Sequence, residues 1–223
     1  MNPFGGPEDD VEVSVIALGA PVPEALLART LSPAEQDRAA RLREGPGREA
    51  FVTTRIALRQ ILAGHLGLQP SAVPLAQREG GKPILDPAAG CADLRFNVSH
   101  SRGIALCAVA FGREVGIDVE WMDPGTPWQA IAAAQFSAQE LGQLMALPLP
   151  ARRPAFFAMW TRKEARLKGQ GTGFARLAPT MEDLAGPWAE AALDIGPEHA
   201  AALGVQSSVL RYQLRPWPMQ SAA

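Results

Sequence analysis

The sequence predicts an α+β fold, and two observations support that class. Runs in which apolar and polar residues alternate, as in half-buried strands, occur near both ends of the chain and in its middle. Helical patterns with clear start and stop signals lie between these runs, without the regular strand–helix alternation of a parallel α/β sheet. The chain has 223 residues, 47% of them hydrophobic and 20% charged, which suffices for one large domain or two small ones.

Seven segments are predicted strands. The last of them is the clearest, because Leu210, Tyr212 and Leu214 alternate with polar neighbours. A hairpin is expected where Gly112-Arg113-Glu114 separates two apolar runs. The predicted strands are residues 11–18, 94–98, 104–111, 115–120, 188–195, 199–206 and 209–217.

Four segments are predicted helices. Two of them open on a capping box, in which Ser32 and Ser137 are the caps and a glutamate follows three residues later. The first helix is expected to break at Gly45-Pro46-Gly47, and the fourth to stop at the glycines that begin with Gly169. The predicted helices are residues 32–44, 48–65, 137–147 and 154–168.

The composition argues against several classes of protein. The formal net charge is -2, whereas a dedicated nucleic-acid binder is usually basic. The acidic start of the chain is unlike a signal peptide, and the longest apolar run, residues 104–111, is too short to cross a bilayer. Two cysteines are too few for a disulfide framework or a typical structural zinc site. We therefore expect a soluble, cytoplasmic protein that binds neither nucleic acid nor membrane.

Lysine is scarce in this chain. Only three of the 21 basic residues are lysines, at Lys82, Lys163 and Lys168. The codon bias of a GC-rich genome would explain the abundant arginine. A lysine that persists under that bias points to a need for a compact ammonium group rather than a planar guanidinium.

Two pairs of charged residues are candidates for chemistry. Asp118 and Glu120 lie two apart on a predicted strand and so share one face, as ligands of a divalent cation or as a solvated edge. Glu164 and Lys168 lie four apart on one helix face. They form either a surface ion pair or a third carboxylate with a cation beside a phosphate.

Two further segments are candidate phosphate contacts. In Asn97-Val98-Ser99-His100-Ser101 a histidine flanked by serines would bind a phosphate, act as a base or cap a turn. Gly80-Gly81-Lys82-Pro83 lets a ligand approach the backbone and offers a point charge, or is only a turn. Neither segment is a nucleophile elbow, a Walker loop or a dinucleotide fingerprint.

Taken in order, the segments GGKP, FNVSHS, GIDVE and WTRKEARLKGQGTGF resemble the motifs of the 4'-phosphopantetheinyl transferase superfamily. The resemblance spans about residues 32–174. The length of the chain, and the half that precedes GIDVE, resemble the larger monomeric type that activates surfactin synthetase (the Sfp type) rather than the short trimeric type.

This resemblance implies two similar α+β halves related by a pseudo-twofold axis, with the active site in the cleft between them. Residues 1–113 would form the N-terminal half, on the side of the nucleotide and 3'-phosphate of coenzyme A. Residues 114–223 would form the C-terminal half, with the metal and the catalytic carboxylates. The implied reaction moves the 4'-phosphopantetheine arm of coenzyme A to a serine hydroxyl of an apo acyl or peptidyl carrier protein and releases 3',5'-ADP. It would require Mg²⁺, for which Mn²⁺ is an expected substitute.

The resemblance also assigns roles to residues. Asp118, Glu120 and Glu164 would ligate Mg²⁺, and Glu164 would act as general base, directly or through water. Lys168 would stabilise the phosphate charge, so that Asp118, Glu164 and Lys168 are the catalytic candidates. Relatives often carry an arginine where this chain has Ala50, and Arg48 or Arg55 would replace it. The expected contacts of coenzyme A are Arg48, Arg55, Gly81, Lys82, Pro83, Ser99, His100 and Lys168.

Other interpretations remain open from the sequence. One is a different Mg²⁺-dependent phosphoryl or nucleotidyl transferase, and another is a non-catalytic protein that binds a carrier protein or coenzyme A. Carrier proteins are generally acidic, so a basic excess would attract one, although the same residues would also suit a solvated helix face. The residues of that excess are Arg152, Arg153, Arg162 and Arg166.

Overall fold

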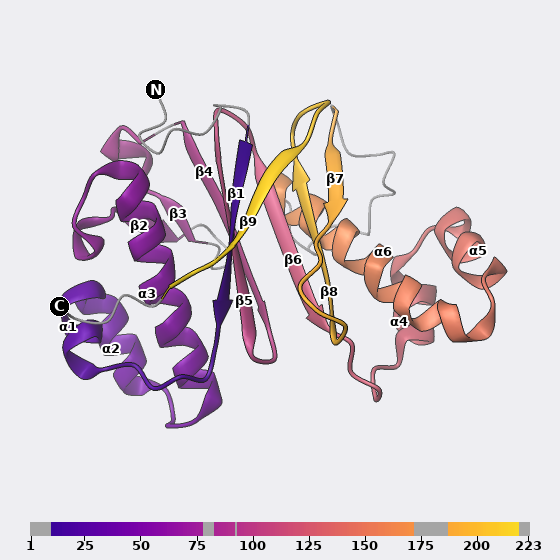
Figure 1. Ribbon diagram of the computed structural model, residues 1–223, viewed down its shortest axis with the longest axis horizontal. Coiled ribbons are helices and arrows are strands. Elements are labelled where there is room, and N and C mark those ends of the chain that lie inside the picture. Colours follow the sequence, from indigo (N-terminus) through magenta and orange to yellow (C-terminus); the bar gives the residue numbers. More distant parts are fainter. Residues whose placement is uncertain (1–9, 78–82, 92, 172–186, 219–223) are drawn as a thin grey trace.

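The computed structural model describes residues 10–77, 83–91, 93–171 and 187–218. Two β-sheets pack face to face, and a long helix covers the outer face of each sheet (Figure 1). The predicted α+β class is confirmed. The first sheet contains, in order, β4 (Leu94–Ser101), β5 (Ile104–Phe111), β1 (Asp10–Ala17) and β9 (Arg211–Pro216), and the second contains β6 (Val115–Trp121), β8 (His199–Val205) and β7 (Ala189–Ala192).

All seven predicted strands are present, with bounds that agree within a few residues. The strand β4 continues through Ser99-His100-Ser101 instead of ending at Val98. The strand β1 pairs antiparallel with β5 and parallel with β9, so the last strand of the chain joins the first sheet. A separate two-stranded sheet of β2 (Leu75–Gln77) and β3 (Pro83–Leu85) forms within the stretch that shows no strand pattern in the sequence.

The expected hairpin between residues 104–111 and 115–120 is wrong. Among the described strands, β5 pairs with β4 and β1, whereas β6 pairs with β8 in the other sheet. The turn at Gly112-Arg113-Glu114 carries the chain from one sheet to the next, and the hairpin is formed instead by β4 and β5 around Arg102-Gly103. Two buried strands joined by a short glycine turn have the same sequence pattern whether they pair edge to edge or pack face to face.

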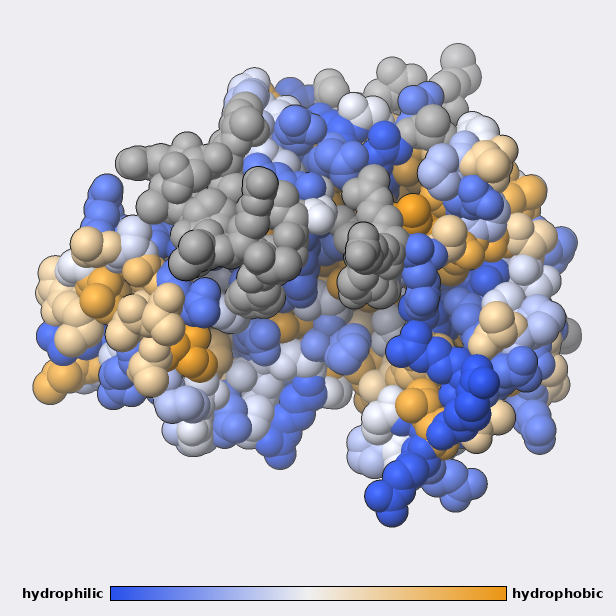
Figure 2. Space-filling model, turned by 180° about the vertical axis from the view of Figure 1, so that it is seen from behind, coloured by the Kyte–Doolittle hydropathy of each residue, from blue (hydrophilic) through white to orange (hydrophobic). Residues whose placement is uncertain are grey.

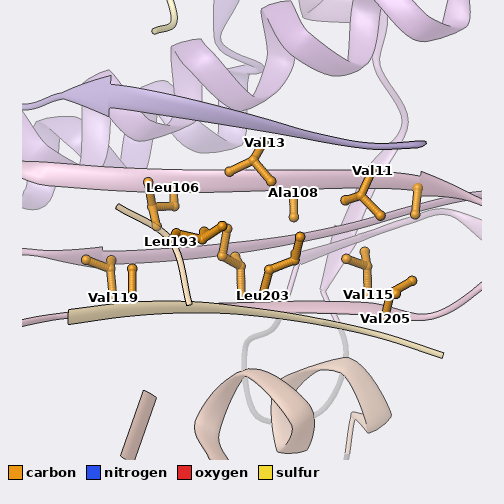
Figure 3. Close-up of a cluster of buried hydrophobic side chains, with 12 residues drawn as sticks. Val11, Val13, Leu106, Ala108, Val115, Val119, Leu193, Leu203 and Val205 are labelled. Carbon is orange, nitrogen blue, oxygen red and sulfur yellow. The ribbon is translucent and has the colours of Figure 1, made fainter. Parts of the chain in front are cut away.

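The core between the sheets is built from alternate residues of their inner faces. Figure 3 shows the apolar side chains of the two sheets pointing toward one another. Successive side chains of a strand point to opposite faces, so the neighbours of these residues face the helices. Each valine, leucine or isoleucine that is fully buried in this way stabilises the fold by about 1.5–3 kcal/mol. The cluster contains Val11, Val13, Leu106, Ala108, Ala110, Val115, Ile117, Val119, Leu193, Ala201, Leu203 and Val205.

Helix α3 (Pro46–Leu66) covers the first sheet, and helix α6 (Leu149–Gln170) covers the second. Both begin earlier than predicted. Pro46 is the first residue of α3, where its missing N–H removes no helical hydrogen bond, and Pro154 lies inside α6. Each helix ends at a glycine in the left-handed conformation. Within the described ranges, no helix is both long and apolar enough to cross a membrane.

The order of elements in the first half of the chain repeats in the second. A strand, two short helices and a long helix follow one another as β1, α1 (Glu24–Thr30), α2 (Pro33–Arg41) and α3, and again as β6, α4 (Trp128–Gln135), α5 (Ala138–Ala146) and α6. Both predicted capping boxes are confirmed, one at the start of α2 and one at the start of α5. The sequence pattern does not predict α1 and α4, which are short. The repeated order supports two similar halves, while the pseudo-twofold axis and the division at residue 113 stay predictions.

The second sheet and α6 approach one another closely at two glycines. A Cβ added to Gly116 of β6 would lie 1.8 Å from the carbonyl oxygen of Ala165 and 2.4 Å from the backbone nitrogen of Gly169. A Cβ added to Gly169 would lie 2.5 Å from the ring of Trp188. Glycine at position 116 therefore lets the helix lie directly against the strand, so that side chains of the two elements meet.

We expect Gly116→Ala to lower the free energy of unfolding by about 1–3 kcal/mol, because the added methyl group overpacks a backbone contact. Gly142→Ala is the matched control. Residue 142 lies inside α5, and no neighbouring atom lies within 4 Å of an added Cβ, so the substitution should raise stability by about 0.5–1 kcal/mol through helix propensity. Urea unfolding measures both changes, and equal effects of the two substitutions would contradict the close approach.

Candidate active site

A ladder of side chains joins β4 of the first sheet to β6 of the second. Asn97 accepts a hydrogen bond from the backbone N–H of Ile117 (N to Oδ1, 2.9 Å). Ser101 accepts one from the N–H of Trp121 (N to Oγ, 2.9 Å) and donates one to Glu120 (Oγ to Oε2, 3.3 Å). The two residues of β4 share one face because they lie four apart on a strand. We call these contacts the β4–β6 side-chain ladder.

Ser99 lies between these two residues, and it binds the side chain of Asp118. Its hydroxyl donates to Asp118 (Oγ to Oδ1, 2.9 Å), and Lys168 of α6 donates to both (Nζ to Oδ1, 2.6 Å; Nζ to Oγ, 2.9 Å). Asp118 is 1% exposed. A buried carboxylate needs such partners, because taking a charge out of water costs several kcal/mol. The cluster therefore ties β4, β6 and α6 together at one point.

Two further carboxylates, those of Glu120 and Glu164, interact with Asp118. Burial is the main cause that raises the pKa of Glu164 to about 7, and the charge of Asp118 raises it further, while the charge of Lys168 opposes the rise. Burial and then the charge of Asp118 also raise the pKa of Glu120, against the hydrogen bond from Ser101. The charges of these three carboxylates thus act on one another, and a cation would relieve their mutual repulsion.

Two carboxylate oxygens of this site fit a hard cation. Asp118 Oδ2 and Glu164 Oε1 are buried, and neither accepts a hydrogen bond within the part of the chain that the structure describes. The carboxylates do not form a complete ligand set, because among the described residues no group of three or more His, Cys, Asp or Glu side chains is close enough to hold a metal ion. These oxygens would therefore supply only part of the ligand shell of a bound cation.

Lys163, the neighbour of Glu164 in the sequence, takes part in helix packing. Its ammonium group donates to the carbonyl oxygen of Gln135 (2.7 Å) and to Glu140 (Nζ to Oε2, 3.1 Å), and the residue is 3% exposed. Glu140 is the capping-box glutamate of α5. Lys163 therefore connects the end of α4 and the start of α5 to α6.

The first half of the chain contains a matching pair. Arg59 of α3 binds Glu35, the capping-box glutamate of α2 (Nε to Oε2, 2.5 Å), and also donates to three backbone carbonyls that follow α3. The glutamate and its cation lie 24 residues apart in this half and 23 in the other. The buried ion pairs thus repeat together with the order of helices.

The residues expected to contact coenzyme A occupy several places. Ser99 belongs to the carboxylate cluster. His100 is exposed and, as the next residue of the strand, points to the opposite face of β4. Pro83 begins β3, whereas Gly81 and Lys82 lie outside the described residues.

An arginine-rich cavity of about 370 Å³ lies between α2, α3 and β2. Two of its guanidinium groups lie over the ring of Phe51, 4.9 and 5.7 Å from the ring centre. Figure 2 shows hydrophilic residues gathered over this helical side, at the lower right. Arg48 lines a different cavity and donates to the carbonyl oxygen of Ala39 (3.1 Å), so of the two arginines expected to bind coenzyme A it is Arg55 that lies here. The arginines that line the cavity are Arg38, Arg41, Arg55 and Arg59.

Two residues of the site, Asn97 and Ser101, are not among the candidates that the sequence predicts. Both lie in the segment from which Ser99 and His100 are predicted to bind a ligand. The available signal was the two-residue spacing of Asn97, Ser99 and Ser101, which places three polar side chains on one face of a strand. The predicted strand ends at residue 98 and leaves out Ser99 and Ser101, so it does not place the three side chains on one face.

The fold and the site define a protein of two packed α+β halves with a carboxylate–lysine centre where their sheets meet. Two family models match the chain: "4'-phosphopantetheinyl transferase, N-terminal" over residues 21–111 and "4'-phosphopantetheinyl transferase superfamily" over residues 114–205. The chain belongs to this superfamily, as the order of its motifs indicates.

Among individual proteins, the chain is similar to the 4'-phosphopantetheinyl transferase HetI of Nostoc sp., with 41% identity over 68% of this chain and 64% of the relative. It is 36% identical to a 4'-phosphopantetheinyl transferase of Bacillus subtilis, over 53% of this chain and 50% of the relative. It is 37% identical to the 4'-phosphopantetheinyl transferase AcpT of Salmonella typhimurium, over 49% and 57%. The chain spans less than two thirds of the length of each of these relatives.

Glu164 should make stability depend on pH. Its pKa of about 7 in the folded protein lies above the ordinary value of 4.5, so folding favours the protonated form. The stability that comes from this proton is complete below the ordinary pKa and is lost as pH rises through the folded value. We therefore expect Glu164→Gln, which cannot ionise, to gain stability relative to wild type as pH rises from about 5 to 8.

Melting temperatures in buffer freed of divalent cations measure this change. Glu44→Gln, at an exposed glutamate, is the control and should track wild type at every pH. A difference between Glu164→Gln and wild type that stays constant with pH would contradict the raised pKa.

Proposed function

We propose that this chain transfers the 4'-phosphopantetheine arm of coenzyme A to a serine hydroxyl of an apo acyl or peptidyl carrier protein and releases 3',5'-ADP. The observation that carries the proposal is the cluster of Asp118, Ser99 and Lys168 beside Glu164, where β4, β6 and α6 meet. The similar proteins HetI, AcpT and that of Bacillus subtilis are each named a 4'-phosphopantetheinyl transferase. The repeated order of elements fits the larger, Sfp type.

In this reaction the serine oxygen attacks the phosphorus atom that carries the pantetheine arm. A P–O bond to the serine forms, the P–O bond to the bridging oxygen of the pyrophosphate breaks, and 3',5'-ADP leaves with that oxygen. The proton of the serine hydroxyl passes to a base. Most of the acceleration must come from positioning the two reactants and stabilising phosphate charge.

Glu164 is the proposed base, acting directly or through water. Its pKa of about 7 leaves a substantial fraction ionised at neutral pH and makes that carboxylate a stronger base than an exposed glutamate. Lys168 is the proposed partner of the phosphate charge. Its ammonium group is held at the site by Asp118 and Ser99.

Asp118, Glu120 and Glu164 are the proposed ligands of Mg²⁺, with Mn²⁺ as a substitute. The two buried oxygens without a hydrogen bond, Asp118 Oδ2 and Glu164 Oε1, support this assignment. When bound, the cation would neutralise oxygens of the pyrophosphate. The protein contributes a strand and a helix that carry the three carboxylates, of which those of Asp118 and Glu164 are buried.

Coenzyme A is proposed to bind at β4, with its 3'-phosphate toward the arginine-rich cavity. Ser99 and His100 lie on opposite faces of this strand, so a ligand that passes over its edge would contact both. Arg55 gains support from its place in the cavity, and Arg48 loses support because it lines another one. The proposed contacts are Arg48, Arg55, Gly81, Lys82, Pro83, Ser99, His100 and Lys168.

The carrier protein is proposed to be attracted by arginines of α6. Arg152 and Arg153 also have packing roles, since they donate to the carbonyl oxygens of Leu147 and Met122. Arg162 is exposed. It is therefore the strongest candidate for electrostatic attraction of an acidic partner.

The remaining expectations stay predictions. They are a monomeric state, a cytoplasmic location, and the absence of nucleic acid and membrane among the partners. The net charge of -2 is the observation that argues against a nucleic-acid partner.

Incubation of the protein with coenzyme A, Mg²⁺ and several unrelated apo carrier proteins tests the proposed function. Mass spectrometry should show that a carrier gains one phosphopantetheine group, and chromatography should show an equal amount of 3',5'-ADP. Coenzyme A binding without a mass gain on any carrier would indicate a non-catalytic relative. Phosphoryl transfer from another nucleotide would indicate a different Mg²⁺-dependent transferase.

We expect Asp118→Ala to lower kcat for transfer by about 100-fold or more, because it removes a carboxylate and a partner of Lys168. Asp37→Ala, at an exposed aspartate of α2, is the matched control and should retain the activity of wild type. Circular dichroism checks that both variants fold. Full, Mg²⁺-dependent activity in Asp118→Ala would remove this residue from the ligand set.

A further inference from the structure

We propose that Asn97 and Ser101 are positioning residues of the active site, which hold the open edge of β6 so that Asp118 and Glu120 keep a fixed place opposite α6. Neither residue is assigned a role by the resemblance to the family. Their effect on catalysis rests on the proposed transfer reaction, and their effect on cation binding rests only on the proposed ligands Asp118 and Glu120.

The open edge of β6 needs hydrogen-bond partners. Among the described strands, β6 pairs with β8 on one edge, and its other edge faces β4. Every second backbone N–H points to that edge, and a buried N–H without a partner is rare in folded proteins. Ile117 is fully buried, and the side chain of Asn97 accepts its N–H. Asn97 is itself 4% exposed, so no bulk water can take its place.

The two backbone N–H groups that donate to Asn97 and Ser101 lie on either side of the carboxylates in the sequence. Ile117 immediately precedes Asp118, and Trp121 immediately follows Glu120. A shift of the strand along its axis, or a rotation about it, would break one or both hydrogen bonds and would move both carboxylates. Ser101 adds a second constraint, because its hydroxyl also donates to Glu120.

Side chains rather than backbone groups bridge β4 and β6 beside the carboxylates. Two paired strands lie about 4.8 Å apart, whereas strands bridged by side chains lie further apart. The middle residue of the face, Ser99, contacts Asp118 and Lys168. The outer residues of the ladder thus fix the strand, and the inner one contacts the groups proposed to act on the ligand.

Two substitutions remove the contacts and two others are controls. Asn97→Leu keeps the size of the side chain and removes the acceptor, and Ser101→Ala removes the hydroxyl that Ser101→Thr retains. Arg95→Ala removes another contact made from the same face of β4, the ion pair of Arg95 with Glu114 (Nε to Oε1, 2.8 Å). The side chain of Arg95 is 40% exposed, and Glu114 lies before the segment between Ile117 and Trp121. Electron paramagnetic resonance measures the Kd for Mn²⁺, and kinetics with a carrier protein separates kcat from KM for coenzyme A.

We expect the Kd for Mn²⁺ to rise about tenfold in Asn97→Leu and in Ser101→Ala, with a fall in kcat larger than any change in KM. Ser101→Thr should restore both values toward those of wild type, and Arg95→Ala should bind Mn²⁺ as wild type does. The proposal is overturned if Asn97→Leu and Ser101→Ala lower only the melting temperature, or if Arg95→Ala weakens Mn²⁺ binding equally. If Asn97→Leu does not fold, the pair of substitutions at Ser101 decides the question.

The same measurements separate this proposal from the proposed function. A wild-type protein that binds Mn²⁺ but modifies no carrier would contradict the proposed function, and the change in Kd would still test the role of Asn97 and Ser101. A wild-type protein that binds no Mn²⁺ would overturn the positioning role.

Discussion

The carboxylate of Asp118 lies buried between the ammonium group of Lys168, 2.6 Å away, and the hydroxyl of Ser99, 2.9 Å away. Its partners come from the helix and from the other sheet. A shift of α6 would leave the buried charge without its cation, at a cost of several kcal/mol, and a shift of β4 would remove a hydrogen bond from it. The apolar core between the sheets has no such directional demand, because hydrophobic burial depends on area rather than on orientation. Gly116 serves the same contact, since the absence of a side chain there lets α6 lie within reach of the strand.

Although the order of elements repeats, the edges of the two matching strands are occupied differently. The strand β1 has backbone partners on both edges, β5 and the terminal strand β9. The matching strand, β6, pairs with β8 on one edge and receives polar side chains from β4 on the other. A backbone ladder would satisfy every amide of that edge, whereas the side chains of Asn97 and Ser101 satisfy two of them and lie on either side of the contact between Ser99 and Asp118. The strand β9 thus covers in the first sheet the edge that, among the described strands, carries no backbone partner in the second, and Asp118 and Glu120 lie on the strand with that open edge.

Local signals predicted much of this structure. Ser32 and Ser137 with their glutamates mark two helix starts, because a capping box is complete within four residues. The alternation in residues 209–217 marks a strand, and it too lies within one short segment. The shared face of Asp118 and Glu120 follows from strand geometry alone. The sheet to which β6 belongs, the ladder from Asn97 and Ser101, and the pairing of Lys163 with Glu140 depend on residues about 20 or more positions apart. No local pattern encodes such contacts, and the short turn at residue 112 favours the wrong neighbour.

The two buried cations of the long helices show why lysine persists in this arginine-rich chain. Arg59 binds a glutamate and three backbone carbonyls at once, a task that suits a guanidinium group with five donors in one plane. Lys163 binds Glu140 and the carbonyl oxygen of Gln135, and the contacts of Lys168 include Asp118 and Ser99. Both lysines lie within four residues of Glu164 in the sequence. A compact ammonium group can approach 2.6 Å from Asp118 in this closely packed region, where the helix backbone already touches the strand. A guanidinium group would need more room than an ammonium group, so the close packing around Gly116 favours lysine at position 168.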